Sequence, residues 1–180
     1  MVEFVLVFPI FFFLLLAIVE FGFVMNALVS VDFATRDAAL AAAEAGNAPD
    51  ADCSILRSLD RGMTTPAKNQ AVSEVRIFKA DTNGKALGPV NIYDRKGTTS
   101  CPLADGTAAT VAYRMVSESY DEANRCNELA GCKVQTTVDT IGVQISYGYS
   151  WVTPLHWIMP TLGPGYNIVK ANAMRMEPVL

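Results

Sequence analysis

The stretch VEFVLVFPIFFFLLLAIVEFGFVMNALVSV, residues 2–31, decides how the rest of the chain is organised. Every residue between Glu3 and Glu20 is apolar, and apolar character continues to the end of the stretch. From Phe4 onward, a helix at ~1.5 Å per residue would extend about 40 Å, which exceeds the roughly 30 Å hydrocarbon core of a bilayer. The stretch therefore predicts one membrane-spanning helix, with its membrane part at about residues 4–28.

A cleaved secretory signal fits this stretch poorly. Lys and Arg are absent before Arg36, so the basic leader of a signal peptide is missing, and Glu20 lies within the apolar run. We expect a retained helix and a single-pass protein, because the rest of the chain has no second apolar stretch of this length. The positive-inside rule finds no Lys or Arg on the N-terminal side of the helix, whereas Arg36 follows it. Taken alone, the rule would therefore place the C-terminal part in the cytoplasm.

Four cysteines favour the opposite orientation. Their even number and the lack of paired C-x-x-C spacings suit two disulfides in an oxidising compartment better than a metal site. Four reduced thiols in a cytoplasmic domain are the alternative. Three connectivities are possible, and we prefer the one in which the two closest cysteines form a small loop: Cys126 with Cys132, leaving Cys53 with Cys101.

Composition and motifs argue against several classes of function. A formal net charge of −4 and a pI near 4.9 speak against a nucleic-acid binder. The sequence has no Gly-rich phosphate loop and no Ser-x-x-Lys or Gly-x-Ser-x-Gly nucleophile pattern. The only histidine, His156, lies between Leu155 and Trp157, where a packed or membrane-proximal side chain is expected. We therefore expect a non-enzymatic protein without a cofactor or a metal.

The N-terminal helix is expected to continue beyond the membrane. The stretch that follows is rich in alanine, and Gly46 and Pro49 supply a stop signal. The outer half carries a face of small residues that a sheet of the same chain, a neighbouring subunit, or both could cover. The members of this face are Leu28, Val31, Thr35, Ala38, Ala42 and Ala45. We divide the chain into an N-terminal transmembrane helix at residues 1–46 and an extracytoplasmic α+β domain at residues 47–180.

The domain is expected to be an antiparallel sheet packed on the outer half of the helix, an α+β arrangement. Its clearest strand is Thr140–Val152, in which Ile141, Val143, Ile145, Tyr147, Tyr149 and Trp151 share one face. In the last expected strand, Asn167–Met176, the residues Val169, Ala171 and Ala173 face one way. The other expected elements are a short helix at Cys53–Leu59, strands at Glu74–Lys79, Asn91–Tyr93 and Thr110–Ser117, a hairpin turn at Thr82–Lys85, and a short acidic helix or loop at Glu118–Leu129.

An apolar patch follows the clearest strand. Trp151, Trp157 and Met159 lie around two prolines. Such a patch is typical of a core or of a surface that rests on the membrane interface, where Trp is favoured. A groove for a partner protein is the alternative.

The N-terminus resembles a known family. Residues 2–9, Val-Glu-Phe-Val-Leu-Val-Phe-Pro, and residues 18–22, Ile-Val-Glu-Phe-Gly, are similar to the signature of TadE-like proteins, the pseudopilins of the tight-adherence (Flp) pilus system. Two weaker similarities to the longer members of that family lie at Val138–Val143 and Ala173–Pro178.

The resemblance implies processing and assembly. A prepilin peptidase would cut just after a glycine a few residues before the position of Glu3, and Glu3 would then pair with the N-terminal amine of an adjacent subunit. Pro9 would lie near the start of the helix, where a loosened turn is least costly. Because the chain starts at Met1, neither the glycine nor a basic leader is present. Either the true start lies upstream, which we favour, or the protein is not processed.

Together these features predict a pseudopilin that acts in the assembly of tight-adherence pili. Glu3, Glu20 and Pro9 are its candidate assembly or inter-helix residues, since an intramembrane carboxylate suggests a function by default. The expected partners are the membrane, other pilins or pseudopilins, the assembly machinery and, if a leader exists, the peptidase. The expected location is the cytoplasmic membrane, with the domain outside the cytoplasm; the cell surface or the pilus is the alternative. A membrane-tethered binding domain or adhesin is the alternative.

Overall fold

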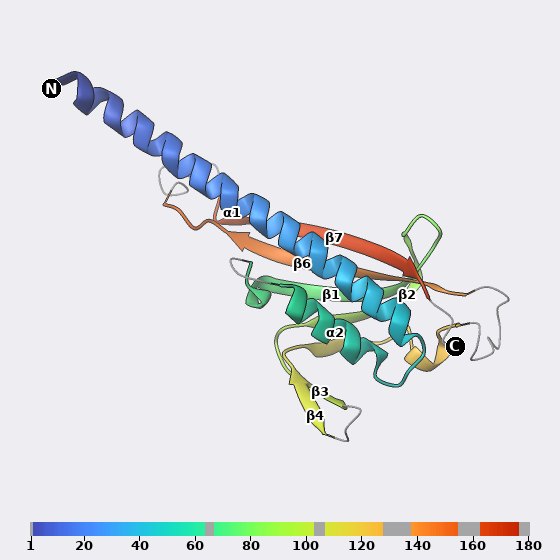
Figure 1. The fold of residues 1–180 in the computed structure, drawn as a ribbon. Helices are drawn as coiled ribbons and strands as arrows, with labels where there is room; N and C mark the ends of the chain where they lie inside the picture. Colours follow the sequence, from blue (N-terminus) through green and yellow to red (C-terminus); the bar gives the residue numbers. More distant parts are fainter. Residues whose placement is uncertain (1, 64–66, 103–106, 128–137, 155–162, 177–180) are drawn as a thin grey trace.

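One long helix lies across a five-stranded antiparallel sheet and projects well beyond it (Figure 1). The computed structural model describes residues 2–63, 67–102, 107–127, 138–154 and 163–176, with side chains from Phe4 onward. The main elements are α1 (Val2–Ala45), α2 (Ala51–Gly62), β1 (Val72–Ala80), β2 (Ala86–Asp94), β5 (Arg114–Ser117), β6 (Thr140–Ser150) and β7 (Gly165–Arg175). The sheet has the order β5-β2-β1-β6-β7, and the helices α1 and α2 pack beside each other. The predicted α+β fold class is confirmed.

The helix α1 ends where the sequence predicts. Gly46 follows its last residue with φ of 58°, and the Gly46 N–H donates to the Ala42 carbonyl at 3.3 Å. This is the left-handed conformation in which glycine commonly closes a helix, because it has no Cβ to clash with the preceding turn.

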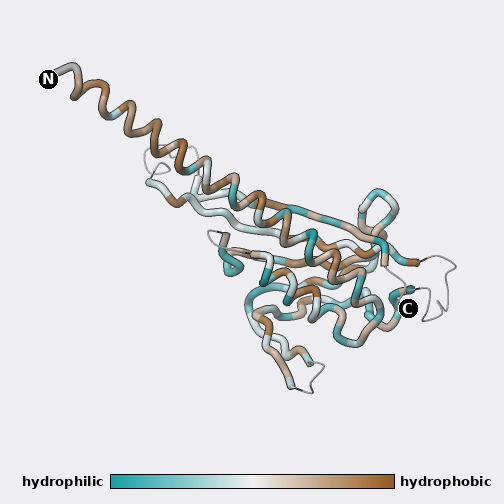
Figure 2. Tube along the Cα trace, viewed as in Figure 1, coloured by the Kyte–Doolittle hydropathy of each residue, from teal (hydrophilic) through white to brown (hydrophobic). Residues whose placement is uncertain are grey.

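The two halves of α1 have different surroundings. Figure 2 shows that the projecting half is almost continuously hydrophobic, whereas the half over the sheet is mixed. The buried face of the second half consists of small residues: Ala27, Val31, Ala34, Thr35, Ala38, Ala39, Ala42 and Ala43. Small side chains let the helix backbone approach its neighbours closely. Packing within the same chain, one of the two expected roles of this face, is thus observed.

The short helix α2 is longer than the predicted Cys53–Leu59. It buries Ile55, Leu56 and Leu59 in the common core. The Cys53–Cys101 disulfide, the pair preferred from the sequence, ties α2 to β3 (Thr99–Pro102). Cys126 is disulfide-bonded as well. Cys132, its preferred partner, lies outside the described residues.

Strands β6 and β7 form the part of the sheet under α1. The predicted inward face of β6 is buried from Ile141 to Tyr149, because alternate side chains of a strand point to the same side. In β7 the side chains paired with that face include Ile168 opposite Tyr147 and Met174 opposite Ile141. The predicted set at Val169, Ala171 and Ala173 therefore lies on the opposite face, where Val169 is 54% exposed.

One predicted strand is wrong. Thr110–Ser117 is not continuous: β4 (Ala108–Val111) pairs with β3 in a separate two-stranded sheet, and β5 pairs with β2. The chain bends between them at the fully buried Tyr113, whose hydroxyl lies between Arg95 and Asp60. The free energy gained by burying the Tyr113 side chain is larger than the free energy of continuing the strand.

The other predicted elements are present with shifted bounds. A hairpin joins β1 to β2, and β2 is longer at both ends than the predicted Asn91–Tyr93. The predicted acidic helix or loop contains the 3-10 turn η2 (Glu122–Asn124), and its last two residues lie outside the described part. A second 3-10 turn, η1 (Asn69–Ala71), leads into β1 and was not predicted.

Candidate functional site on the N-terminal helix

The first part of α1 projects beyond the domain as an apolar rod (Figure 1). From Phe4 to Val19 the side chains are exposed, with Leu16 half-buried. The helix from Phe4 to Ala45 contains an 18-residue window of mean hydropathy 2.8. It is therefore long and apolar enough to cross a membrane. Exposed apolar surface of this extent on a protein marks an interaction with lipid or with other proteins.

Two of the three predicted assembly residues lie at the start of this rod. Glu3 is in the first turn of α1, and its side chain is outside the described part. Pro9 is inside the helix, which continues through it. Because proline has no N–H, the Val5 carbonyl one turn earlier lacks its usual helical donor. Pro9 is exposed, and this part of α1 projects beyond the sheet (Figure 1).

Glu20, the third residue, marks the point where α1 meets the domain. Its side chain is only 3% exposed, and its carboxylate accepts hydrogen bonds from the end of β6 and the residues that follow. Oε1 accepts from the Tyr149 hydroxyl at 2.5 Å and from the Val152 N–H at 3.1 Å. Oε2 accepts from the Thr153 N–H at 2.7 Å. The carboxylate thus satisfies two backbone donors that lie beyond the sheet ladder.

These contacts give Glu20 a role that the sequence did not indicate. Charge-assisted hydrogen bonds are stronger than neutral ones, so these three neutral donors stabilise the buried carboxylate. As a candidate assembly or inter-helix residue, Glu20 was expected to contact another helix, whereas the observed donors belong to the domain of the same chain. They are 129 to 133 residues away in the sequence, and no local pattern signals such a contact.

An aromatic cluster adjoins Glu20. The ring centroids of Tyr149, Trp151 and Tyr166 are 5.4 to 6.1 Å apart, and the Trp151 Nε1–H donates to the Gly163 carbonyl at 3.0 Å. Burial, followed by the hydrogen bond to Glu20, raises the pKa of Tyr149 above its ordinary value. Tyr149 therefore stays protonated as the donor to Glu20. His156 and Trp157 lie outside the described residues.

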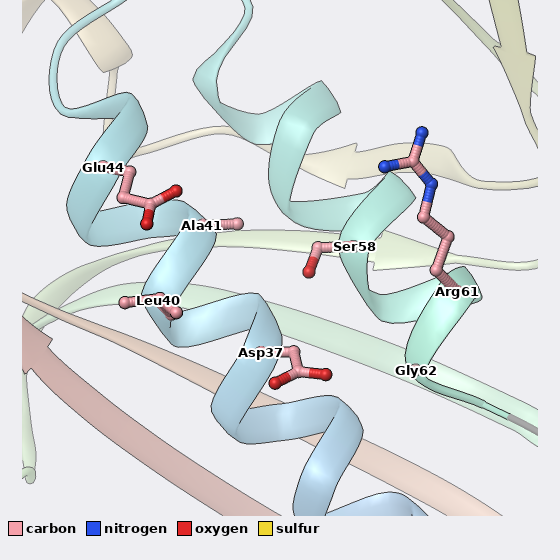
Figure 3. A pocket seen from close by; sticks show the side chains of 7 residues that line it. All are labelled: Asp37, Leu40, Ala41, Glu44, Ser58, Arg61 and Gly62. Atoms are coloured by element: carbon pink, nitrogen blue, oxygen red, sulfur yellow. The ribbon is translucent and has the colours of Figure 1, made fainter.

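An open groove runs between the outer half of α1 and α2. Figure 3 shows the Asp37 and Ser58 side chains directed into the space between the helices, while Arg61 extends away from Asp37. The groove has a volume of about 320 Å³. Its lining residues are Asp37, Leu40, Ala41, Glu44, Ser58, Arg61 and Gly62. The lining is of mixed charge and contains no side chain with an evident catalytic partner among those named.

A buried polar network holds α2 to the domain. Asp52 Oδ2 accepts from Asn91 Nδ2 at 2.8 Å and from the Tyr93 hydroxyl at 2.7 Å, and Asp52 Oδ1 pairs with Arg125. Glu122 Oε1 accepts from the Asp52 N–H at 2.7 Å. Burial raises the pKa of Glu122, and it also raises the pKa of Tyr93 together with the Asp52 charge. Sequence reasoning missed this network because its members come from three segments that are far apart in the sequence.

The buried network has the character of a structural centre. Asp52 is paired with Arg125 and also accepts hydrogen bonds from Asn91 and Tyr93, which offsets the desolvation cost of a buried charge. Among the described residues, no group of three or more His, Cys, Asp or Glu side chains is placed to hold a metal ion. The candidate site is therefore the projecting helix with its junction at Glu20.

Comparison with known proteins points to the same helix. The family model described as TadE-like protein matches residues 1–40, which contain Glu3, Pro9 and Glu20. The predicted resemblance is confirmed over this segment. The two weaker similarities near the C-terminus lie outside the match and stay predictions. Neither the curated proteins nor the solved structures include a match to this chain.

Proposed function

We propose that this protein is a TadE-like pseudopilin, a non-enzymatic single-pass membrane protein that acts in the assembly of tight-adherence (Flp) pili. The observation that carries the proposal is the location of the family match, residues 1–40. The match contains the whole apolar rod that α1 extends beyond the domain. A family that assembles through its N-terminal helix would need this segment free of its own domain.

The proposal places the domain outside the cytoplasm. The Cys53–Cys101 disulfide supports this orientation, because disulfides form and persist in oxidising compartments. The helix would cross the cytoplasmic membrane, and its partners there would be other pilins or pseudopilins, the assembly machinery and, if a leader is present, a prepilin peptidase.

The two carboxylates would have separate tasks. Glu20 is engaged within the chain by three donors, so it fixes the domain to the helix. Glu3 lies at the far end of the rod and would be the one that meets a neighbouring subunit. A carboxylate–amine pair in a low-dielectric helix bundle attracts strongly, and loss of one partner leaves an uncompensated charge. The apolar side chains between the two would pack against neighbouring helices.

A substitution at Glu3 tests the proposal. In cells that depend on this protein for pili, Glu3→Gln removes the charge with little change in size. We expect loss of pili while the protein level in the membrane stays normal, measured by filament yield after shearing and by immunoblotting of membranes.

The matched control is Glu44→Gln, the same change at an exposed position of the same helix. Pili should form normally in this variant. Normal piliation and normal extraction from the membrane in Glu3→Gln would contradict the pseudopilin proposal. That result would favour a tethered binding domain, whose display does not require Glu3.

A further inference from the structure

The rod that projects from the domain is too short to cross a bilayer by itself. The apolar run between the two carboxylates, Phe4 to Val19, extends about 24 Å at ~1.5 Å per residue, against a hydrocarbon core of roughly 30 Å. Apolar side chains continue past Glu20 on the outward side of α1, where Phe21 is 60% and Met25 43% exposed. An apolar span starting at Phe4 therefore needs about another turn of helix, which brings the membrane boundary to the level of Glu20 and Phe23.

At that level α1 is already in contact with the domain. Figure 1 shows the end of β6 beside α1 where the helix leaves the sheet. The hydrogen bonds from Tyr149, Val152 and Thr153 to Glu20 fix this end of the sheet to the same turn of the helix. Any membrane that reaches this turn also reaches the end of β6.

The side chains at this end of the sheet suit a lipid headgroup region. Tyr149, Trp151 and Tyr166 form the aromatic cluster, and Val152 beside it is 61% exposed. Lys68 is exposed and lines, with Phe23, Tyr149 and Val152 among others, a cavity of about 110 Å³ at the same place. Trp and Tyr are enriched at membrane–water interfaces, and a nearby cation is attracted to anionic headgroups.

We propose that the β6–β7 end of the domain is seated in the headgroup region of the bilayer, with Trp151 and Val152 as its membrane-contacting residues. The occupant of this surface is lipid, because the surface is continuous with the membrane-spanning helix and held rigidly to it. Glu20 is already buried between the helix and the domain, so at this depth its carboxylate does not meet hydrocarbon. The inference rests on the membrane span and is independent of a role in pili.

Depth-dependent fluorescence quenching tests the proposal. Trp151 and Trp157 are the two tryptophans of the chain, so Trp157→Phe leaves Trp151 as the single reporter. The full-length variant is placed in phosphatidylcholine–phosphatidylglycerol vesicles that contain phosphatidylcholine brominated either near the headgroup or near the end of the acyl chain. We expect strong loss of Trp151 emission with shallow bromines, less loss with deep bromines, and weak quenching by acrylamide in the aqueous phase.

A second fluorescent reporter tests the same surface without relying on how the Trp151 side chain packs. Val152→Trp in a Trp151→Phe, Trp157→Phe background places the indole at an exposed position and should give the same order of quenching. Leu87→Trp in that background is the matched negative control, because Leu87 is 53% exposed and lies on β2. It should be quenched by acrylamide and not by either brominated lipid.

Phe12→Trp in the same background reports on the span itself and should be quenched more by deep bromines. Suppose that brominated lipid quenches the indole of Phe12→Trp but leaves the emission of Trp151 and of Val152→Trp unchanged. The proposal would then be wrong, although α1 would still span the membrane. If both reporters were also shielded from acrylamide, another protein subunit would cover this surface. If neither brominated lipid quenched Phe12→Trp, α1 would not span the bilayer, and the inference depends on that span.

Discussion

At the residue scale, the Glu20 carboxylate fixes the position at which α1 leaves the sheet. It accepts the N–H groups of Val152 and of the buried Thr153. A buried donor that loses its acceptor carries a desolvation penalty of about 1–3 kcal/mol. The side chain therefore contributes to the order of the β6 end as well as to the attachment of the helix.

A double-mutant cycle between Glu20 and Tyr149 measures this contact. Tyr149→Phe removes one hydrogen bond to a charged acceptor and should lower the free energy of unfolding by about 1.5–3 kcal/mol. Glu20→Gln replaces one acceptor oxygen with a donor and should cost at least as much. The combined variant should be less destabilised than the sum of the two, with a coupling energy of about 1 kcal/mol or more.

The measurement is denaturant unfolding of the full-length protein in detergent micelles, followed by near-ultraviolet circular dichroism. Glu44→Gln, at an exposed position of the same helix, should leave the free energy of unfolding unchanged within about 0.5 kcal/mol. Strictly additive effects of Glu20→Gln and Tyr149→Phe would show that the two side chains do not interact.

The sequence marks Glu20 as unusual and says nothing of its partners. A carboxylate in an apolar run can be recognised as unusual from the neighbouring residues alone. The donors lie more than a hundred residues away, and backbone N–H groups are present at every position except proline. Asp52 had no local anomaly, so its network with Asn91, Tyr93 and Arg125 could not be predicted at all.

At the element scale, close contact between α1 and α2 depends on a glycine. A Cβ added at Gly62 would lie 2.8 Å from the Ala34 Cα, and the backbone of α1 cannot move aside without disturbing its packing on the sheet. The neighbouring side chains on α1 are alanines for the same reason: small residues permit close approach of helix backbones.

The variant Gly62→Ala should lower the free energy of unfolding by about 1–2 kcal/mol. The overpacking cost of about 1–3 kcal/mol exceeds the gain of up to about 1 kcal/mol from the better helix propensity of alanine. Gly22→Ala is the matched control, because a Cβ at Gly22 meets nothing within 4 Å. It should be neutral or slightly stabilising. Thermal unfolding in detergent micelles compares the two, and equal melting temperatures would refute the proposed tight contact.

The prediction of elements was most accurate where periodicity is strong. The alternation from Ile141 to Tyr149 and the Ala-rich run before Gly46 each extend over many residues, so both elements were located from the sequence. Thr110–Ser117 was predicted as one strand because its composition favours strands throughout. The bend at Tyr113 results from tertiary burial, which periodicity does not report, and the four-residue β3 is too short to produce a pattern.

At the scale of the whole molecule, α1, α2 and the sheet share one hydrophobic core. The core includes Val31 of α1, Leu56 of α2 and Ile145 of β6, all buried. The predicted division at residue 46 remains a convenient description of the sequence. The outer half of α1, however, contributes to the core of the domain that follows it, so we expect truncation before Ala27 to be tolerated better than truncation after it.

Several buried tyrosines make the stability of this core sensitive to alkaline pH. Burial raises the pKa values of Tyr93, Tyr113 and Tyr120 above the ordinary value of about 10. For a group whose pKa is raised on folding, the stabilisation is complete below the unfolded pKa and is lost as the pH rises through the folded pKa. The free energy of unfolding should therefore fall above about pH 10, by up to about 1.4 kcal/mol per pH unit for each such tyrosine.

Absorbance of tyrosinate during an alkaline titration checks this prediction. In the folded protein, ionisation of these tyrosines should appear only together with loss of the circular dichroism signal, whereas the urea-denatured protein should titrate near pH 10. Complete ionisation of all six tyrosines at an intact circular dichroism signal would contradict the burial described for them.

The small-residue face of α1 also determines how force passes through the molecule. Figure 1 shows α1 running lengthwise over β6 and β7, and the buried members of the small-residue face are spread from Ala27 to Ala43. A pull along the helix axis, such as removal of the anchor from a membrane would require, loads these contacts in shear and all together. Resistance to such a pull is set by the rate of forced unfolding. The domain would follow its helix out of the bilayer as one mechanical unit.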